Sequence, residues 1–314
     1  MPLVSVGVPV LNGEKYLEQT LEALAAQTLD DIEILISDNA SVDRTREIAE
    51  AFAARDARFV VLPHTPRLGF ADNWNRTLAA ASGEYFMWNA SDDLARPDHL
   101  RSCVDALRDR PDAVVAFSRV ERINETGATI GSRNDERLDF DVPAHERVRT
   151  FFTREVFQAV GWGGVFRTER LRRFGGLPRL FGGDFPLGIR MAMSGPWAPV
   201  PRVLYAERVH GEQTTNMQAG DPIEQVRMFQ PERTVSFAFP QWELARAMYL
   251  AALRGPGLAS ERWRAALAIL TSWSLPQWRL LPWDLKRNAV RLLHGRYGVD
   301  RWSDSVRASE ASRG

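Results

Sequence analysis

The chain has very little lysine and cysteine. Of its 40 Lys and Arg residues only Lys15 and Lys286 are lysines, and 40 acidic residues bring the formal net charge to zero. A general nucleic-acid-binding protein needs a basic surplus for the phosphates, so this balance argues against a nucleic-acid partner. The single cysteine, Cys103, cannot form an internal disulfide, and no Cys/His zinc spacing is present. These absences favour a reducing, cytoplasmic setting.

Long apolar runs are also absent. No stretch approaches the roughly 18 apolar residues of a membrane-spanning helix, and the N-terminus lacks the charged and apolar regions of a signal peptide. Apolar residues nevertheless make up 45% of the 314 positions, enough for a sizeable core. We therefore expect a cytoplasmic protein that is soluble or at most peripheral at the inner face of the membrane.

Three common nucleotide and hydrolase motifs are missing. No G-x-G-x-x-G follows the first strand pattern, which disfavours a dinucleotide-binding domain. The phosphate-binding pattern G-x-x-x-x-G-K-[ST] and the nucleophile pattern G-x-S-x-G are absent too, which excludes P-loop enzymes and disfavours α/β-hydrolases.

The first hundred residues alternate between two hydrophobic periods. Short apolar runs typical of buried strands alternate with segments of helical spacing. This order predicts an α/β fold with a mostly parallel, doubly wound sheet and helices on both faces. The expected strands are 4–10, 32–37, 59–62, 84–88 and 112–117, and the expected helices are 13–27, 45–54, 72–81 and one opened by Pro97. Later segments predict a hairpin and loop at 123–146, a helix at 185–194 and a strand at 198–205.

The C-terminal part has a different character. Helical patterns cover 242–253, 260–273 and 283–294, and this part contains six of the ten tryptophans, alternating with arginines. We expect a domain at 1–225, with halves 1–120 and 121–225, followed by a helical region at 226–314. Two interpretations of residues 240–300 stay open. The helices lie on a membrane interface, or they pack on the first domain or on a second subunit of a homodimer.

Polar side chains follow three of the expected strands. Asn12 follows the first strand, Asp38 closes the second, and Asp92 and Asp93 follow the fourth. In an open α/β sheet, ligands bind beyond the carboxyl ends of the strands. Adjacent carboxylates there suit a divalent cation that also binds phosphate oxygens. A helix cap or a solvated turn would explain the Asp pair equally well.

Three stretches, in this order, resemble the nucleotide-sugar-binding half of family 2 glycosyltransferases. They are VSVGVPVLNGEKYLEQTLEALAAQT, IEILISDNASVDRT and RLGFADNWNRTLAAASGEYFMWNASDDLARPDHL. The resemblance covers roughly residues 3 to 215 and weakens after residue 120. It implies the GT-A fold, Rossmann-like with a mostly parallel sheet flanked by helices, here with a helical C-terminal appendage. It also implies an inverting enzyme that moves a sugar from a UDP- or dTDP-sugar to an acceptor hydroxyl, assisted by Mn²⁺ or Mg²⁺.

The resemblance assigns roles in donor binding. Pro9 and Asn12 match the loop that cups the nucleoside, and Asp38 matches the acid that accepts the pyrimidine N–H. A fixed carboxylate at a strand end can accept that proton from uracil or thymine. Asn73 falls where the family places a residue near the ribose and diphosphate.

The resemblance also assigns the metal ligands. Asp92 and Asp93 match the end of the family's D-x-D motif, with Asp92 in the nucleotide-sugar site and Asp93 as the metal ligand. The first acid of the longer D-x-D-D form is Ala90 here, which puts the ribose contact and tight metal binding in doubt. Tyr205 to His210 resembles a strand that ends in Y-R-x-H in the family. His210 is expected to ligate the metal or contact the diphosphate, or to be a structural histidine.

Two further residues are assigned to the acceptor side. Asp184 takes the position of the family's general base, with Gly183 in place of the usual Glu; a helix cap is the alternative. Trp162 is expected to stack on an acceptor sugar or to pack in the core. The acceptor class stays open between a polysaccharide, a lipid-linked saccharide and a natural product.

Two other functions compete with this one. A nucleotidyltransferase would normally have a Gly- and cation-rich loop after the first strand, where this chain has Pro9-Val10-Leu11-Asn12-Gly13. A catalytically silent sugar-nucleotide or glycan-binding protein of the same fold is favoured by Ala90 and Gly183.

Overall fold

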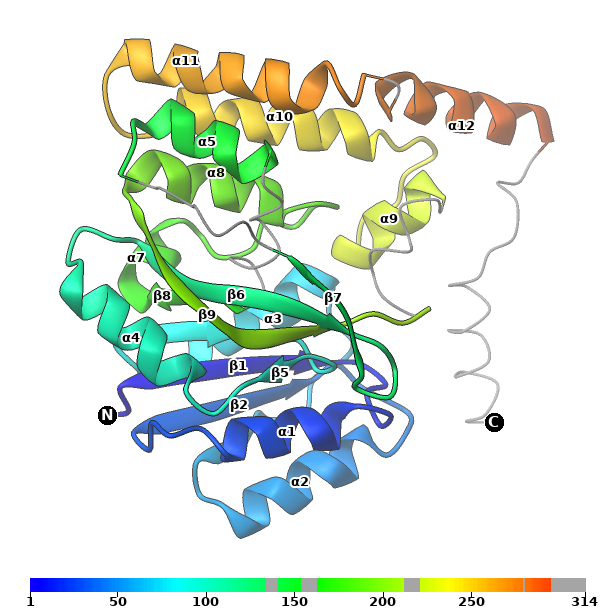
Figure 1. The fold of residues 1–314 in the computed structure, drawn as a ribbon. Helices are drawn as coiled ribbons and strands as arrows, with labels where there is room; N and C mark the ends of the chain where they lie inside the picture. The colour runs from blue at the N-terminus through cyan, green and yellow to red at the C-terminus, as the bar shows by residue number, and fades with distance from the viewer. Residues whose placement is uncertain (134–140, 154–162, 212–220, 279, 295–314) are drawn as a thin grey trace.

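One mixed β-sheet forms the centre of the molecule. The computed structural model describes residues 1–133, 141–153, 163–211, 221–278 and 280–294. In these residues nine strands form one sheet in the order β3-β2-β1-β4-β8-β6-β9-β5, with β7 paired to β6. In Figure 1, α1 and α2 lie below the sheet, and α5, α8, α10 and α11 lie above it. The predicted α/β class is therefore confirmed.

The N-terminal half builds the parallel part of this sheet. Strand β1 pairs in parallel with β2 and with β4, and β2 pairs in parallel with β3, so their carboxyl ends meet at one edge. All seven residues of β1 are buried, because helices cover both faces of a parallel sheet. The elements are β1 (Val4–Val10), α1 (Leu17–Ala25), β2 (Ile32–Asp38), α2 (Thr45–Arg55), β3 (Phe59–Val61), α3 (Phe70–Ala80), β4 (Tyr85–Trp88), β5 (Leu94–Ala95) and α4 (His99–Asp109).

The middle of the chain continues the same sheet. Strand β8 runs antiparallel to both β4 and β6, and β6 pairs in parallel with β9. The predicted strand at 112–117 is longer, because β6 extends to Ile123 and turns back into β7. The elements are β6 (Val115–Ile123), β7 (Thr129–Arg133), α5 (Ala144–Thr153), β8 (Val165–Arg167), α7 (Thr168–Arg173), α8 (Asp184–Ser194), β9 (Trp197–Arg208) and α9 (Pro222–Phe229).

The described part of the C-terminal region, 226–278 and 280–294, consists mainly of helices, as predicted. It contains α10 (Pro240–Leu253), α11 (Ala259–Ile269), the π-helical turn η2 (Leu270–Ser274) and α12 (Leu280–His294). Helix α10 packs on α8, and α11 packs on α5 and α10. His145 Nδ1 of α5 lies 2.9 Å from Glu261 Oε2 of α11. Among the described residues, no helix combines the length and apolarity that crossing a bilayer requires.

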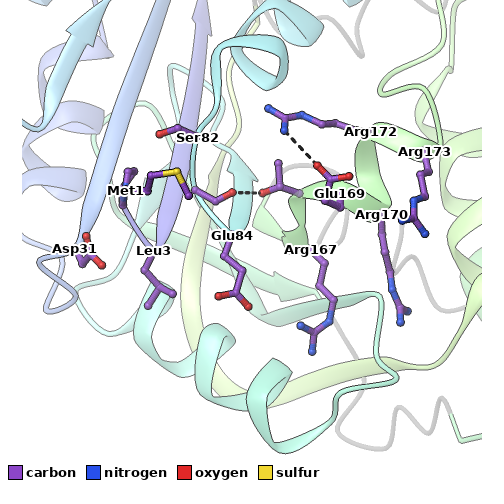
Figure 2. Close-up of a pocket in the computed structure, with 13 residues that line it drawn as sticks. Met1, Leu3, Asp31, Ser82, Glu84, Arg167, Glu169, Arg170, Arg172 and Arg173 are labelled. Atoms are coloured by element: carbon purple, nitrogen blue, oxygen red, sulfur yellow. Dashed lines mark hydrogen bonds and ion pairs between the residues drawn. The ribbon is translucent and has the colours of Figure 1, made fainter.

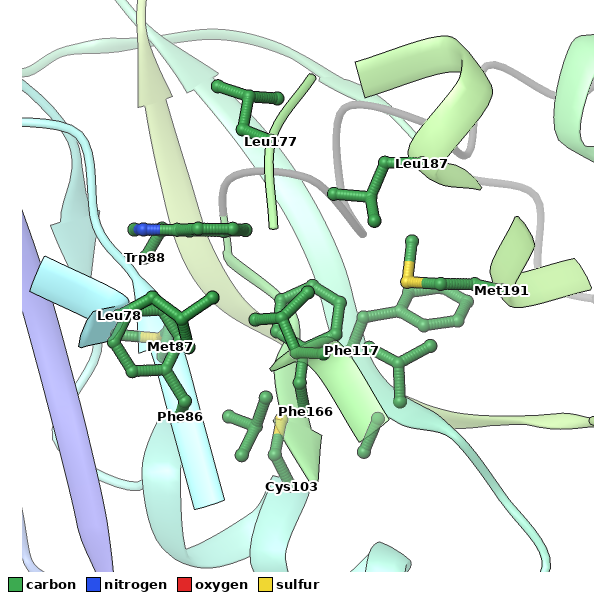
Figure 3. Close-up of a cluster of buried hydrophobic side chains, with 14 of the residues drawn as sticks. Leu78, Phe86, Met87, Trp88, Cys103, Phe117, Phe166, Leu177, Leu187 and Met191 are labelled. Carbon is green, nitrogen blue, oxygen red and sulfur yellow. The ribbon is translucent and has the colours of Figure 1, made fainter. Parts of the chain in front are cut away.

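One continuous apolar core joins these layers. Figure 3 shows Trp88 and Phe86 of β4 beside Phe166 of β8, with Leu187 and Met191 of α8 on the right of the view. The Trp88 and Phe86 rings meet edge to face at 5.2 Å between centroids, a favourable arrangement for aromatic pairs. Buried residues of α10 and α11 belong to the same cluster. The division into domains at 1–225 and 226–314 stays a prediction.

Gly7 in the middle of β1 gives a test of this packing. A Cβ on Gly7 would lie 2.2 Å from Thr77 Oγ1 and 2.9 Å from Phe86 Cζ, and Thr77 is held in α3 by its bond to the Trp74 carbonyl. We expect Gly7→Ala to lower the free energy of unfolding by about 1–3 kcal/mol through overpacking. In urea titrations Gly131→Ala, where no atom lies within 4 Å of the new Cβ, should stay within about 0.5 kcal/mol of the parent. Equal stability of the two variants would contradict the packing.

Candidate functional site

The carboxyl ends of β1, β2 and β4 bring three loops to one edge of the sheet. Val10 is in register with Asp38, and Gly7 with Trp88. The ladder continues for one residue beyond each strand, since Asn39 N donates to Val10 O at 2.8 Å and Asn89 N donates to Gly7 O at 2.9 Å. The predicted convergence of the polar strand ends is therefore present.

The first two loops are hydrogen-bonded to each other. Asn12 has a positive φ of 51°, a backbone region that asparagine tolerates better than most residues. Its side-chain oxygen accepts from Val42 N at 3.0 Å, and its own N–H donates to Ser41 Oγ at 2.8 Å. Pro9, whose contact with the nucleoside stays a prediction, precedes this loop. It lies within β1, in register with Ser37, because the parallel ladder extends to Val10.

Asp38 closes β2 and is buried at the floor of this edge. Its Oδ1 accepts from Ser41 N at 3.0 Å, and its exposed fraction is 3%. Asn73 of α3 does not reach beyond the neighbouring Ser37. Its Oδ1 accepts from Ser37 Oγ at 2.7 Å and its Nδ2 donates to Ser37 O at 3.1 Å. Both polar atoms of Asn73 therefore fix the end of β2.

Arg76 places a cation beside Asp38. One turn after Asn73, Arg76 Nη1 donates to Ser37 Oγ at 3.2 Å. Burial lowers the pKa of Arg76 and the charge of Asp38 raises it, so the guanidinium and the carboxylate interact. The sequence reasoning missed Arg76, although its helical spacing of three residues from Asn73 places it on the same face of α3.

The two acids of the motif point in different directions. Asp93 is 4% exposed and faces β9, where Oδ1 accepts from Arg208 N at 2.8 Å and Oδ2 accepts from Tyr205 Oη at 3.2 Å. Burial, followed by the charge of Asp92, raises the pKa of Asp93 well above its usual range. Asp93 thus ties the loop after β4 to the end of β9.

Asp92, rather than Asp93, meets His210. His210 Nε2 lies 2.8 Å from Asp92 Oδ2, and the His210 ring lies 5.0 Å from the Tyr16 ring between centroids. The side chain of Asp92 is 24% exposed, so it is accessible to a ligand. Within the described residues no cluster of three or more His, Cys, Asp or Glu side chains could hold a metal ion. Asp92 and His210 could supply two ligands, with phosphate oxygens and water completing the shell.

Arg208 organises the surroundings of this pair. It is fully buried, and its guanidinium donates to the carbonyls of Asp92, Asn124 and Glu125 and to Gln19 Oε1 at 2.9–3.2 Å. It is therefore bonded to internal acceptors. Its partners include these backbone carbonyls, the Gln19 amide and the Tyr16 ring, 4.6 Å from the guanidinium carbon to the ring centroid.

Asp184 is the first residue of α8, with Gly183 at the N-cap. Burial raises the pKa of Asp184 to about 6, against the lowering effect of the N–H groups of Asp184 and Phe185. The family's Glu does not fit at position 183, because a Cβ there would lie 2.4 Å from Pro178 O. Trp162, the predicted acceptor contact, lies outside the described residues.

A separate hollow lies at the opposite edge of the sheet. It has a volume of about 840 Å³ and is lined by residues that precede β1 and β4 and by arginines of β8 and α7. Figure 2 shows Arg167, Arg170, Arg172 and Arg173 around it. Parallel strands place their amino ends away from their carboxyl ends, so this hollow is not part of the candidate site.

The sequence profile of glycosyl transferase family 2 matches residues 5–181. The chain belongs to this family. The match includes Asp38, Asp92 and Asp93 and stops before Asp184 and His210.

Relatives of this family 2 chain carry glycosyltransferase names. EpsH of Bacillus subtilis strain 168 is 32% identical over 170 residues, which are 54% of this chain and 48% of EpsH. The chain thus spans about half the length of EpsH. An uncharacterized glycosyltransferase of Haemophilus influenzae is 26% identical over 74% of this chain and 73% of its own length.

Solved structures support the fold. TarS of S. aureus, residues 1–349 in complex with UDP-GlcNAc, has a TM-score of 0.64 and 15% identity, covering 91% of this chain and 81% of that one. The mannosyltransferase PcManGT of Pyrobaculum calidifontis, in complex with GDP-Man and Mn²⁺, has a TM-score of 0.52 and 21% identity, covering 94% and 88%. The predicted GT-A fold is confirmed for this family 2 member.

Proposed function

We propose that the chain is an inverting glycosyltransferase that moves a sugar from a UDP- or dTDP-sugar to an acceptor hydroxyl. One observation carries the proposal: Asp38, at the end of β2, and the Asp92–His210 pair lie at the same carboxyl edge of β1, β2 and β4. That edge is where open α/β sheets bind nucleotides. Family membership supports the reaction class.

Asp38 recognises the uracil or thymine of the donor nucleotide. One of its oxygens already accepts from Ser41 N, which fixes the carboxylate and leaves lone pairs for the N–H of uracil or thymine. Arg76 places a positive charge beside this carboxylate. TarS has been crystallised with UDP-GlcNAc and with UDP, which supports a nucleotide-sugar donor here.

The diphosphate is held near Asp92 and His210. A carboxylate and an imidazole suit Mn²⁺, and Mg²⁺ commonly binds through one or two carboxylates plus substrate phosphates. A divalent cation bound there supplies positive charge to the departing diphosphate. Asp93 acts through position, because its bonds to Arg208 N and Tyr205 Oη hold the loop that carries Asp92. The resemblance alone had assigned the metal to Asp93.

The acceptor is activated by Asp184. Its carboxylate takes the proton of the acceptor hydroxyl while that oxygen attacks the anomeric carbon, and the bond to the diphosphate oxygen breaks on the opposite face. A pKa near 6 suits a base that works at neutral pH. The acceptor is a polysaccharide, a lipid-linked saccharide or a small natural product. The relationship to the chondroitin synthase of Escherichia coli, 24% identical over 68% of this chain and 30% of that protein, supports the first.

Asp38→Asn tests the donor assignment. The amide presents an N–H where the uracil N–H needs an acceptor, so UDP affinity should fall by about tenfold or more. Thermal shift with UDP, dTDP and GDP, each with and without Mn²⁺, measures this. Asp31→Asn, an exposed acid just before the other end of β2, should bind UDP like the parent. Stabilisation by GDP alone would contradict a pyrimidine donor.

Asp92→Asn and Asp93→Asn separate the two acids. Manganese should strengthen UDP binding to the parent and to Asp93→Asn, and should have little effect on Asp92→Asn, because only Asp92 lies against His210. Calorimetric titration of UDP in Mn²⁺ and in chelator measures the difference. If manganese strengthens UDP binding to Asp92→Asn and not to Asp93→Asn, Asp93 is the metal ligand. If the parent binds UDP equally well with and without metal, the site does not bind a metal with the nucleotide.

Asp184→Asn tests the base. Its kcat should fall by about 10²-fold or more, with donor affinity unchanged. Parental activity should rise as the pH passes about 6, where the carboxyl ionises. Asp221→Asn is the control, since Asp221 caps α9 by accepting from Ile223 N and should affect stability only. Donor binding without transfer or donor hydrolysis in the parent would instead favour a silent sugar-nucleotide-binding protein.

The Asp184 carboxyl should also change the free energy of unfolding with pH, in the opposite direction to an acid whose pKa is lowered by folding. Its folded pKa of about 6 exceeds the ordinary 3.8, so the folded state binds the proton more tightly. Stability should therefore fall as the pH rises from about 4 to about 6, and Asp184→Asn should lose that part of the pH dependence. Urea unfolding at several pH values measures it independently of catalysis.

A further inference from the structure

Exposed apolar side chains concentrate on the C-terminal helices. Among the described residues, twelve of the eighteen exposed large apolar side chains lie between Phe237 and Leu293. In Figure 1, α11 and α12 follow one another along the side of the molecule farthest from α1 and α2. The twelve are Phe237, Phe239, Trp242, Leu258, Trp263, Leu267, Leu270, Leu275, Trp278, Leu285, Leu292 and Leu293.

Helix α11 is apolar on two opposite faces. Its inner face, which contains Ala265 and Ile269, is fully buried where the helix packs on α5 and α10. Its outer face carries Trp263, Leu267 and, at the start of η2, Leu270, at 68%, 57% and 40% exposure. The spacing of four and three residues places these side chains on one stripe. A soluble helix normally has a polar outer face.

Helix α12 has its polar side buried and its apolar side exposed, the opposite of an ordinary surface helix. Its buried side is polar: Asp284 Oδ2 accepts from Gln241 N at 2.9 Å, and the Asn288 side chain bonds to both the N–H and the carbonyl of Ala238. Its exposed side carries Leu285, Leu292 and Leu293 at 54%, 70% and 79% exposure. The chain thus uses polar contacts to attach α12 and keeps its leucines outside.

The charge of this region is positive and faces outward. Residues 240–294 contain eight Arg and Lys residues and three acids, in a chain whose total charge is zero. Each of the three acids already has a partner or is buried. Asp284 is buried against α10. Glu243 pairs with Arg233 at 2.9 Å, and Glu261 pairs with His145 at 2.9 Å. Exposed cations include Arg246, Arg254 and Lys286, whereas the exposed Arg264 also pairs with Glu261 at 3.2 Å.

We propose that the outer face of α11, η2 and α12 docks on the surface of an anionic lipid bilayer. Tryptophan and leucine beside Arg and Lys are the composition of helices that lie in the headgroup region, and anionic lipid attracts the cations. A second copy of the chain would bring the same cations face to face in a two-fold dimer, which disfavours that occupant. The inference does not depend on which reaction the site performs.

Vesicle co-sedimentation of the full chain tests this surface. The chain should pellet with equal parts of phosphatidylglycerol and phosphatidylcholine at low ionic strength, and much less with phosphatidylcholine alone or in high salt. Trp263→Ser combined with Leu267→Ser should reduce the bound-to-free ratio by about tenfold or more. The control, Ile130→Ser with Val203→Ser, removes two exposed apolar side chains from β7 and β9 and should bind like the parent.

Charge reversal tests the electrostatic part. Arg254→Glu and Lys286→Glu should each lower binding by about fivefold, whereas Arg108→Glu, an exposed arginine of α4, should not. Thermal unfolding checks that the variants remain folded. A parent chain that stays in the supernatant with anionic vesicles at low salt overturns the proposal. If the parent forms a dimer and does not bind vesicles, and the double variant Trp263→Ser with Leu267→Ser is a monomer, the face binds a second copy of the chain. If vesicle binding appears only after residues 295–314 are removed, that segment, and not a bilayer, is the occupant of this face in the full chain.

Discussion

The buried carboxylate of Asp93 is the contact on which the donor side of the site depends. It leaves the loop after β4 and accepts from the backbone of β9 at Arg208 and from Tyr205 Oη. Burying an acid is costly unless its oxygens are hydrogen-bonded, and both oxygens are bonded here. Because Asp93 faces inward, Asp92 is held outward against His210, the second residue after Arg208. The Asp93 contact therefore fixes the distance between two parts of the chain that are 118 residues apart.

Most of the fold follows from local hydrophobic pattern. The strands β1, β2 and β4 are short and mostly apolar, and the helices between them have clear spacing, so their existence and order could be predicted from the sequence. The extension of β6 to Ile123 could not, because its last residues are polar and owe their strand conformation to pairing with β7 and β9. Long-range pairing overrides local preference in such segments.

The site was predictable in position and less so in detail. The convergence of Asn12, Asp38 and Asp92 follows from parallel strands alone. The roles of Asp92 and Asp93 could not be told apart, since neighbouring residues in a loop point to different sides and only tertiary contacts decide which is buried. The contacts of Tyr205 with Asp93 and of Arg76 with Ser37 could not be predicted for the same reason, since each joins residues distant in sequence. Gly183 had looked like a weakened motif, but the Pro178 carbonyl leaves no room for a side chain there.

The two halves of the proposed site are held by different layers. Asp92 and His210 are fixed by the sheet, through β4 and β9. Asp184 begins α8, which packs on α5 and α10, and Gly182 just before it approaches Leu244 of α10 so closely that a Cβ would lie 2.9 Å from Leu244 Cδ2. Helix α10 in turn is capped by Asp284 of α12. The proposed docking face on α11 and α12 is therefore connected to α8, which begins with the proposed base, through α10 and α5. The Asp92–His210 pair is instead held on the sheet by the contacts of Asp93 with β9.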